Sequence, residues 1–282
     1  MISIFLLLGI GLKGGHALKE ISLSSFIGPA MATLGLGLLT PSLAFLTLKL
    51  VRRISDMDRG AIAAHYGSTS LVSFSAALLF LENSAIEVEG FATALLTIME
   101  IPGIVMGIYL GSRKNDKSVP WGKTIHEVVT GSTILLLVGG LVIGAATSHV
   151  GYMKVAPFFI DLQSGFLALF LLHLGYTAGT NWGEIRKVGA VIGAFGIIFP
   201  IFSGTLGVVV GNLVGLSIGG ATILGVLTAS ASYIAAPAAV SVGLPEANAP
   251  LALMSSIGVT FPFNLFLGIP LYFEIAQKLS AL

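Results

Sequence analysis

The sequence predicts an all-α polytopic membrane protein, on the grounds of its composition, its long uncharged runs and an internal repeat. Hydrophobic residues make up 55% of the 282 residues and charged residues only 10%, whereas a soluble domain has roughly 25% charged residues. No Asp, Glu, Lys or Arg occurs between residues 188 and 245. Because about 20 apolar residues suffice to span a bilayer, we expect the chain to cross the membrane several times.

The second half of the chain repeats the first. Residues 10–21 align with residues 174–185 at an offset of 164, and residues 67–70 align with residues 229–232 at an offset of 162. Single matches mean little in a chain with 36 glycines, but their preserved order and nearly constant offset indicate a duplication. A duplicated membrane protein with inverted halves is typical of secondary transporters.

Nine hydrophobic segments are predicted from these apolar runs: 1–13, 26–50, 60–81, 88–111, 126–148, 157–178, 188–213, 217–241 and 249–273. The first is too short to span a bilayer, and the next three are full spans of the first repeat. The fifth has no counterpart in the first half. The last four are the repeat partners of the first four segments.

This arrangement predicts a first repeat over 1–111, a linker over 112–124 and a second repeat over 125–282. Repeat partners lie five spans apart, an odd number, so each repeat of five helices has a topology opposite to the other. The first repeat is incomplete, and we expect about one and a half helices upstream of residue 1, removed by truncation or a late start codon. A secretory signal is the alternative, but a basic n-region and a small-residue cleavage site are both missing.

Lys and Arg at the ends of the segments predict the orientation. Ten lie on one side and four on the other, and the positive-inside rule assigns the larger set to the cytoplasm. The linker 112–124 is then cytoplasmic, in a multi-pass protein of the bacterial inner membrane. The ten are Lys49, Arg52, Arg53, Arg59, Arg113, Lys114, Lys117, Lys123, Arg186 and Lys187, and the four are Lys13, Lys19, Lys154 and Lys278.

Two segments carry polar, helix-weakening residues in mid-span, at 65–73 and at 228–237, and the second run ends in Pro237. Paired interruptions at corresponding positions of two repeats are the best sequence pointer to the midplane site of a transporter. A half-helix beginning there directs free N–H groups and a positive dipole end at the site, which suits an anion. The alternative is that these small hydroxylated residues only pack helices together.

Glu100 is an acidic residue inside the predicted span 88–111, and it directly precedes Ile101 and Pro102. Its near-equivalents in the second repeat are Thr260 and Asn264, which flank Pro262. An intramembrane carboxylate is by default a functional hypothesis, so these three residues are predicted to bind Na⁺ or relay a proton. The alternative is that Glu100 lies near the cytoplasmic boundary and is hydrated.

Other patterns indicate packing or exclude whole classes of protein. Glycines at 103, 107 and 111 and at 207, 211 and 215 predict close helix contacts. A Walker A sequence, an H-E-x-x-H motif and paired membrane aspartates are all lacking, so we expect neither an ATP-driven pump nor an enzyme. With no cysteine and a net charge of +1, no cofactor, thiol metal site or nucleic-acid partner is expected.

The chain resembles the cyanobacterial-type sodium-dependent bicarbonate transporters, a family within the bicarbonate permeases. The stretches that carry the resemblance are 10–15, 81–84, 99–102, 229–237 and 243–248. The resemblance implies ten helices in two inverted repeats, divided into a core and a gate domain, with bicarbonate and Na⁺ held where two broken core helices meet. Carried over by position, this site falls on Ser68, Ser70, Ser73, Ser230, Ser232 and the backbone around Tyr233. The predicted substrate-binding residues are these and their neighbours in the two runs, Gly67, Thr69 and Ala236.

The chain departs from the family pattern in three places. The family has three serines followed by Asp where this chain has Ser230, Ala231, Ser232 and Tyr233, and it commonly has Asp at Glu100. Losing a hydroxyl and a carboxylate changes what the site can hold, and Tyr233 is expected to fill part of the cavity. The linker is also shorter, so regulation by a PII-like partner is not expected.

The function predicted from the sequence is cation-coupled secondary transport of a small anion by alternating access. Bicarbonate is the leading substrate and Na⁺ the leading coupling ion, in symport. One alternative is a carrier of a small carboxylate coupled to H⁺, and another is a membrane sensor or subunit that binds the anion without moving it. The small-residue ridges and the gate domain predict a homo-oligomer.

Overall fold

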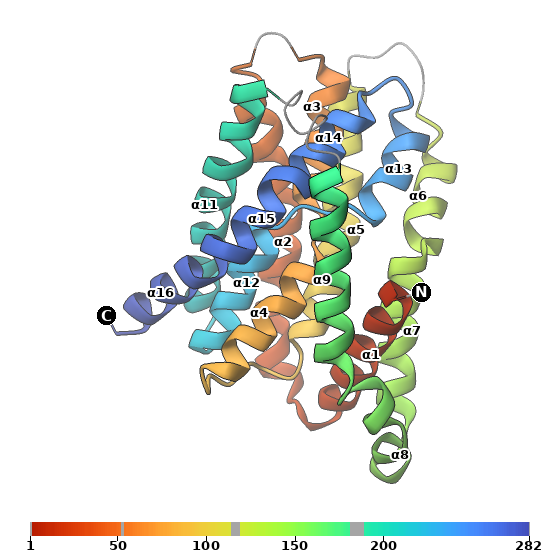
Figure 1. Cartoon of the computed structure of the whole chain (residues 1–282), viewed down its shortest axis with the longest axis vertical. Coiled ribbons are helices and arrows are strands. Elements are labelled where there is room, and N and C mark those ends of the chain that lie inside the picture. The colour runs from red at the N-terminus through yellow and green to blue at the C-terminus, as the bar shows by residue number, and fades with distance from the viewer. Residues whose placement is uncertain (1, 52–53, 114–118, 181–188, 282) are drawn as a thin grey trace.

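The computed structural model describes residues 2–51, 54–113, 119–180 and 189–281, and no β-strand occurs among them. Figure 1 shows a bundle in which most helices run roughly along the long axis of the molecule. The predicted all-α class is confirmed. Within the described part, six helical stretches are long and apolar enough to cross a membrane, or up to seven when one bent pair counts as a single span.

The described part of the first half contains five α-helices. They are α1 (Ile2–Ala17), α2 (Leu23–Leu48), α3 (Asp56–Gly67), α4 (Leu71–Asn83) and α5 (Ala92–Ser112), with a short 3-10 helix (Leu18–Glu20) after α1. The helix α1 is apolar but has only 16 residues, which agrees with the prediction that the first segment is too short to span. The predicted segment 60–81 is divided into α3 and α4 by a break at residues 68–70.

The second half begins with α6 (Trp121–Thr130), α7 (Ser132–Ala146), α8 (His149–Phe159) and α9 (Gln163–Thr180), followed by α11 (Gly189–Leu213). The predicted segment 126–148 is bent by 50° between α6 and α7. Next come α12 (Ile218–Ala229) and α13 (Ala235–Gly243), which divide the predicted segment 217–241.

The last predicted segment, 249–273, is one long helical stretch of changing geometry. It passes through α14 (Ala249–Met254), a π-helix (Ser255–Thr260), α15 (Phe261–Phe263), a second π-helix (Asn264–Gly268) and α16 (Ile269–Ser280). Residues 121–124 of the predicted linker form the first turn of α6. Six of the ten predicted cytoplasmic cations lie outside the described residues: Arg52, Arg53, Lys114, Lys117, Arg186 and Lys187.

Glycines bring the central helices into close contact, as the small-residue ridges predict. A Cβ added at Gly103 would overlap the Gly67 carbonyl, and one at Gly107 would overlap the backbone of Ala64, so α5 lies directly against α3. Gly207 packs in the same way against α12. Gly215 does not belong to this ridge, because it has a φ of +81° just after the end of α11, a conformation that favours glycine.

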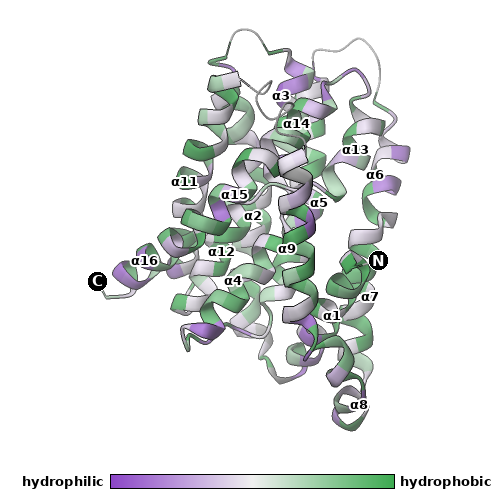
Figure 2. Ribbon diagram, in the orientation of Figure 1, coloured by the Kyte–Doolittle hydropathy of each residue, from purple (hydrophilic) through white to green (hydrophobic). Residues whose placement is uncertain are grey.

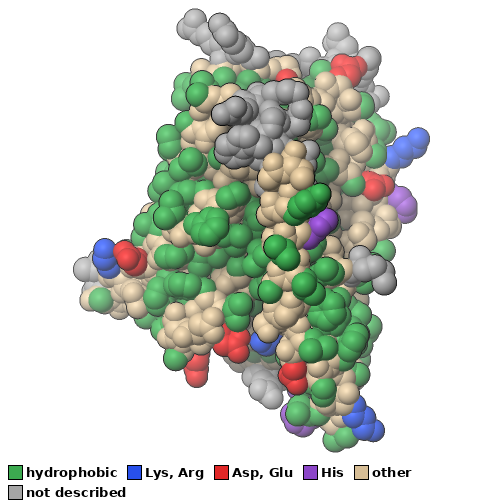
Figure 3. All heavy atoms as spheres, viewed as in Figure 1, with side chains coloured by type: hydrophobic (Ala, Val, Ile, Leu, Met, Phe, Trp, Pro, Cys, Tyr) green, Lys and Arg blue, Asp and Glu red, His purple; other side chains and the backbone are tan. Residues whose placement is uncertain are grey.

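Hydrophobic residues predominate along much of the length of the helices (Figure 2). Figure 3 shows hydrophobic side chains over the middle of the visible face and charged side chains toward its ends and at the tip of α16. Large apolar side chains on three different helices illustrate this exposure: Leu172 at 71%, Ile198 at 66% and Phe266 at 78%. A soluble monomer rarely exposes so continuous an apolar surface, so the fold is that of a multi-pass membrane protein.

Candidate functional site: the crossing of two interrupted helices

Each of the two predicted polar runs interrupts a helix. The helix α3 ends at Gly67 and α4 begins at Leu71, while α12 ends at Ala229 and α13 begins at Ala235. The residue that follows each first half is extended, with φ and ψ of −103° and 158° at Ser68 and −79° and 163° at Ser230. Short hydroxyl side chains favour such conformations because they hydrogen-bond to nearby backbone groups.

The two interruptions contact each other directly. The Ser70 amide donates to the Ser230 hydroxyl at 2.9 Å, and the Ser232 amide donates to the His65 carbonyl at 2.8 Å. In Figure 1, α3 lies above α4 whereas α12 lies below α13, so the two broken helices run in opposite directions. The crossing therefore brings together residues that are 160 or more positions apart in the chain.

Serines cap the helices that begin at the crossing. The Ser70 hydroxyl accepts from the Ser73 amide at 3.2 Å and from the Ser73 hydroxyl at 3.1 Å. The Ser232 hydroxyl accepts from the amides of Ala235 and Ala236, both at 3.3 Å. The N-termini of α4 and α13 consequently meet at a cluster of hydroxyl groups, and each helix contributes the positive end of its dipole.

Eight of the nine predicted substrate-binding residues are assembled at this crossing. Their side chains are almost fully buried, with exposed fractions of no more than 4%, at Ser68, Thr69, Ser70, Ser73, Ser230, Ser232 and Ala236. Tyr233 is partly buried, and it accepts a hydrogen bond from the Ser70 hydroxyl at 3.4 Å and packs edge-on against Phe261. Gly67 lies on the other side of α3, where it contacts Gly103 and Pro41, so its observed role is close packing.

Glu100 holds the first interruption in place. Its Oε2 atom accepts from the Thr69 amide at 3.0 Å and from the Thr69 hydroxyl at 2.5 Å. Only 1% of Glu100 is exposed, so the alternative in which it is hydrated at the boundary is wrong. The carboxylate therefore lies directly behind the backbone at which α4 begins.

Thr260 and Asn264 have partners of their own, and among the described residues neither of them forms a hydrogen bond with Glu100. The Asn264 amide nitrogen donates to the Ala229 carbonyl at 2.8 Å, where α12 ends. Thr260 donates to the Gly196 carbonyl at 2.7 Å and shares a hydrogen bond of 2.6 Å with the Tyr66 hydroxyl. The three predicted cation-binding residues thus lie around the crossing and do not form one cluster.

Tyr66 and Tyr272 form hydrogen bonds to residues around the crossing, although neither was predicted from the sequence as a site residue. The Tyr66 hydroxyl joins α3 to the first π-helix through Thr260, and the Tyr272 hydroxyl donates to Asn264 Oδ1 at 3.1 Å. Both tyrosines are at most 1% exposed. A tyrosine in the middle of a span could have indicated such a contact from the sequence, because a buried hydroxyl group needs a hydrogen-bond partner.

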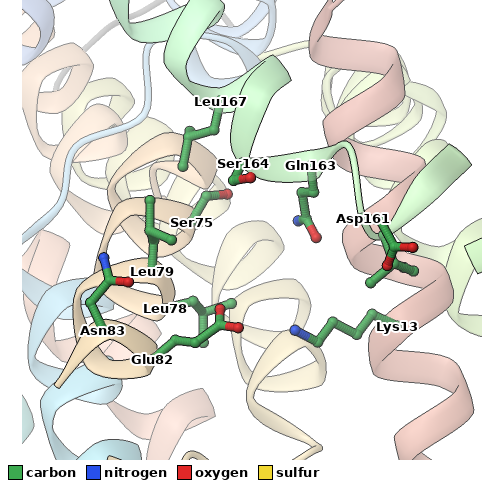
Figure 4. Close-up of a pocket in the computed structure, with 11 residues that line it drawn as sticks. Lys13, Ser75, Leu78, Leu79, Glu82, Asn83, Asp161, Gln163, Ser164 and Leu167 are labelled. Atoms are coloured by element: carbon green, nitrogen blue, oxygen red, sulfur yellow. The ribbon is translucent and has the colours of Figure 1, made fainter. Parts of the chain in front are cut away.

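A polar cavity opens beside α4, along its face from Ser75 to Asn83 (Figure 4). It has a volume of about 290 Å³ and lies between α4, α1 and the turn that joins α8 to α9. Lys13, Glu82 and Asp161 project into it from these three elements, and Lys13 and Glu82 face each other in the figure. A neighbouring cavity of about 220 Å³ shares Lys13, Leu78 and Glu82, so the two cavities adjoin, and together they are called the groove below.

The described residues include no group of three or more His, Asp or Glu side chains arranged to hold a metal ion.

A family model described as the Na⁺-dependent bicarbonate transporter superfamily matches residues 1–277 of the chain. No curated protein matches it.

Proposed function

Because this chain belongs to the Na⁺-dependent bicarbonate transporter superfamily, we propose that it is a secondary carrier that moves a small anion together with a cation. Bicarbonate is the leading substrate, Na⁺ is the leading coupling ion, and symport by alternating access is the mechanism. The observation that carries the proposal is the crossing of α3–α4 with α12–α13, where two helix N-termini meet in buried hydroxyl groups.

The crossing suits a monoanion of a few atoms. Hydroxyls of Ser70, Ser73 and Ser232 lie there beside the first amides of α4 and α13. Helix N-termini bind anions through free amides and the macrodipole, and in a buried site with little water such interactions are stronger than in bulk solvent. The serines now cap these amides, so we propose that the substrate takes over part of the capping.

A coupling cation is proposed because of the negative charge of Glu100 at the crossing. Glu100 brings a carboxylate to the back of the first interruption, where on its own it would repel the substrate anion. A Na⁺ ion held by the Glu100 carboxylate and nearby hydroxyl or carbonyl oxygens would neutralise this repulsion. Each ion then improves the binding of the other, which is the physical basis of symport.

The inverted repeat is supported by the bounds of the elements. Both α3 and α12 have 12 residues, and the second starts 162 residues after the first (218 − 56). Their N-caps, Ser55 and Ser217, are separated by the same interval. The N-terminus of each of these two helices is hydrogen-bonded to a loop from the other half of the chain. At α12 the Ser217 amide donates to Glu89 at 2.6 Å, and at α3 Asp58 accepts from the Asn248 amide at 2.6 Å.

We propose that α2–α5 and α11–α16 form the core, and that α1 and α6–α9 form the gate. The groove at Lys13 and Glu82 separates α4 from α1 and the α8–α9 turn. At the other end, α13 packs on α6, where Gly243 lies against Thr124 and Thr124 is completely buried. We propose that the linker 112–124 is cytoplasmic, so that the groove faces the outside and the packed end of α6 and α13 faces the cytoplasm.

Uptake of labelled bicarbonate by purified protein in proteoliposomes tests the proposal. An inward Na⁺ gradient should drive accumulation, and unlabelled bicarbonate should compete better than formate or acetate. Uptake that is driven by a proton gradient and blocked by small carboxylates would indicate that the substrate is a carboxylate and not bicarbonate. Binding of bicarbonate without any uptake would indicate a sensor.

A further inference from the structure

A second charged cavity lies at the opposite end of the molecule from the groove at Lys13. It has a volume of about 370 Å³ and is formed where the end of α2, the start of α3 and the end of α5 meet. Lys49 and Arg113 line it together with Asp56, and Phe45, Leu46 and Leu110 form its apolar part. None of these residues belongs to the crossing or to the transport route proposed above.

The cavity carries an excess of positive charge. The Asp56 carboxylate is paired with Arg59 at 2.5 Å, and Arg59 also donates to the carbonyls of Leu48 and Val51 at the end of α2. Asp56 is therefore neutralised within the fold. Lys49 and Arg113 make no ion pair with a described carboxylate, so two cations from two helices remain for a ligand.

Each of these two cations lies against an aromatic ring. The Lys49 ammonium lies 5.3 Å from the centre of the Phe45 ring, and the Arg113 guanidinium lies 5.7 Å from the centre of the Tyr109 ring. Such cation–π contacts orient a charged group and leave its N–H donors free for hydrogen bonds. Both cations line the same cavity, and phosphate oxygens accept strong, charge-assisted hydrogen bonds from arginine and lysine.

Below the cations, the wall is apolar and faces outward. Leu46, which lies almost one turn before Lys49 in α2, is 54% exposed, as expected of a side chain that contacts acyl chains. The cavity thus has a cationic rim at the end of the spans and an apolar flank along them. This polarity fits a molecule with an anionic head and an apolar tail, and a soluble phosphate would leave the flank uncovered.

We propose that this cavity binds the phosphodiester headgroup of an anionic phospholipid, with Lys49 and Arg113 on the phosphate and an acyl chain along Leu46. Basic pockets between spans on the cytoplasmic side are suited to such headgroups. The proposal rests on the membrane placement given above, but it is independent of the transported solute and of the coupling ion.

Lipid binding to the purified protein in detergent tests this proposal, measured by native mass spectrometry with phosphatidylglycerol, phosphatidylcholine and glycerol 3-phosphate as probes. Phosphatidylglycerol should bind the wild type at least tenfold more tightly than phosphatidylcholine. The double variant Lys49→Gln with Arg113→Gln should bind phosphatidylglycerol about 30-fold more weakly, because each cation near an anionic headgroup contributes roughly a fivefold factor.

The control is the double variant Lys123→Gln with Lys154→Gln, which removes the same charge at two exposed lysines outside the cavity. It should bind phosphatidylglycerol like the wild type, as should Lys49→Arg, which keeps the charge. Equal weakening in both double variants would overturn the site. Binding of glycerol 3-phosphate as tight as that of the lipid would also overturn it, since the ligand would then be a soluble phosphate.

Discussion

Glu100 places a carboxylate inside the membrane-spanning part of the molecule, where an unpaired charge is costly. Two donors from Thr69 satisfy one of its oxygens, so the carboxylate has both a structural and an electrostatic effect at the crossing. The sequence predicted that Glu100, Thr260 and Asn264 bind a cation together, because all three lie near a proline at corresponding places of the two repeats. The sequence could not reveal that each contacts a different part of the fold, since that depends on packing between distant elements.

Replacing Glu100 by Gln should separate these two effects. The amide oxygen can still accept from Thr69, so the interruption should keep its shape, whereas the negative charge is lost. We expect the Na⁺ concentration for half-maximal uptake to rise roughly tenfold, which corresponds to about 1.5 kcal/mol from one charge-assisted contact. Uptake into proteoliposomes over a Na⁺ titration measures this.

Glu274→Gln is the matched control, because Glu274 lies on the exposed part of α16 and pairs only loosely with Lys278 at 4.0 Å. It should leave the Na⁺ titration unchanged. Full cation dependence in Glu100→Gln would remove Glu100 from the coupling mechanism.

At the scale of elements, the broken helices could be anticipated and the π-helices could not. The runs at 65–73 and 228–237 contain hydroxylated residues and Gly67 or Pro237 in mid-span, so local chemistry predicts the two breaks that the structure contains. The π-helical turns at Ser255–Thr260 and Asn264–Gly268 have no such local signature. They occur where Thr260 and Asn264 reach α11 and α12, which only the assembled fold determines.

The contact between α3 and α5 predicts a large effect of one methyl group. In Gly103→Ala the new Cβ would overlap the Gly67 carbonyl, so α5 would have to move away from the first interruption. We expect a loss of about 1–3 kcal/mol in stability, as for other overpacked interiors, together with impaired uptake. Thermal unfolding in detergent and the monodisperse yield measure the first effect.

Gly139→Ala in α7 provides the comparison, since no atom lies within 4 Å of a Cβ added there. Its stability should stay within about 1 kcal/mol of the wild type, because alanine is the better helix former. Equal stability of both variants would show that α3 and α5 are not packed as closely as described.

For the whole molecule, the account requires that the groove at Lys13 and the linker end of α6 lie on opposite sides of the membrane. The natural chain contains no cysteine, so single cysteines report sidedness without background. In intact cells, Ser164→Cys in the groove should react with a membrane-impermeant maleimide. Lys123→Cys on α6 should react only after permeabilisation, and labelling of both from the same side would contradict the proposed topology.

The sequence predicted the membrane class, the family and the two helix breaks, because each depends on composition or on short local patterns. The groove at Lys13, Glu82 and Asp161 was not predicted, since its residues come from α1, α4 and the α8–α9 turn. Two of the stretches that carry the family resemblance, 10–15 and 81–84, contribute to this groove. Their importance therefore became clear only once the helices were placed.

The most direct test of the central claim is equilibrium binding of labelled bicarbonate, in the presence of Na⁺, to the wild type and to Ser70→Ala with Ser232→Ala. We predict at least about 100-fold weaker binding in the double variant, since two hydrogen bonds to a charged ligand contribute about 3 kcal/mol or more. The control Ser84→Ala with Ser241→Ala removes hydroxyls at the far ends of α4 and α13 and should bind normally. Unchanged binding in the Ser70 and Ser232 variant would contradict the crossing as the anion site.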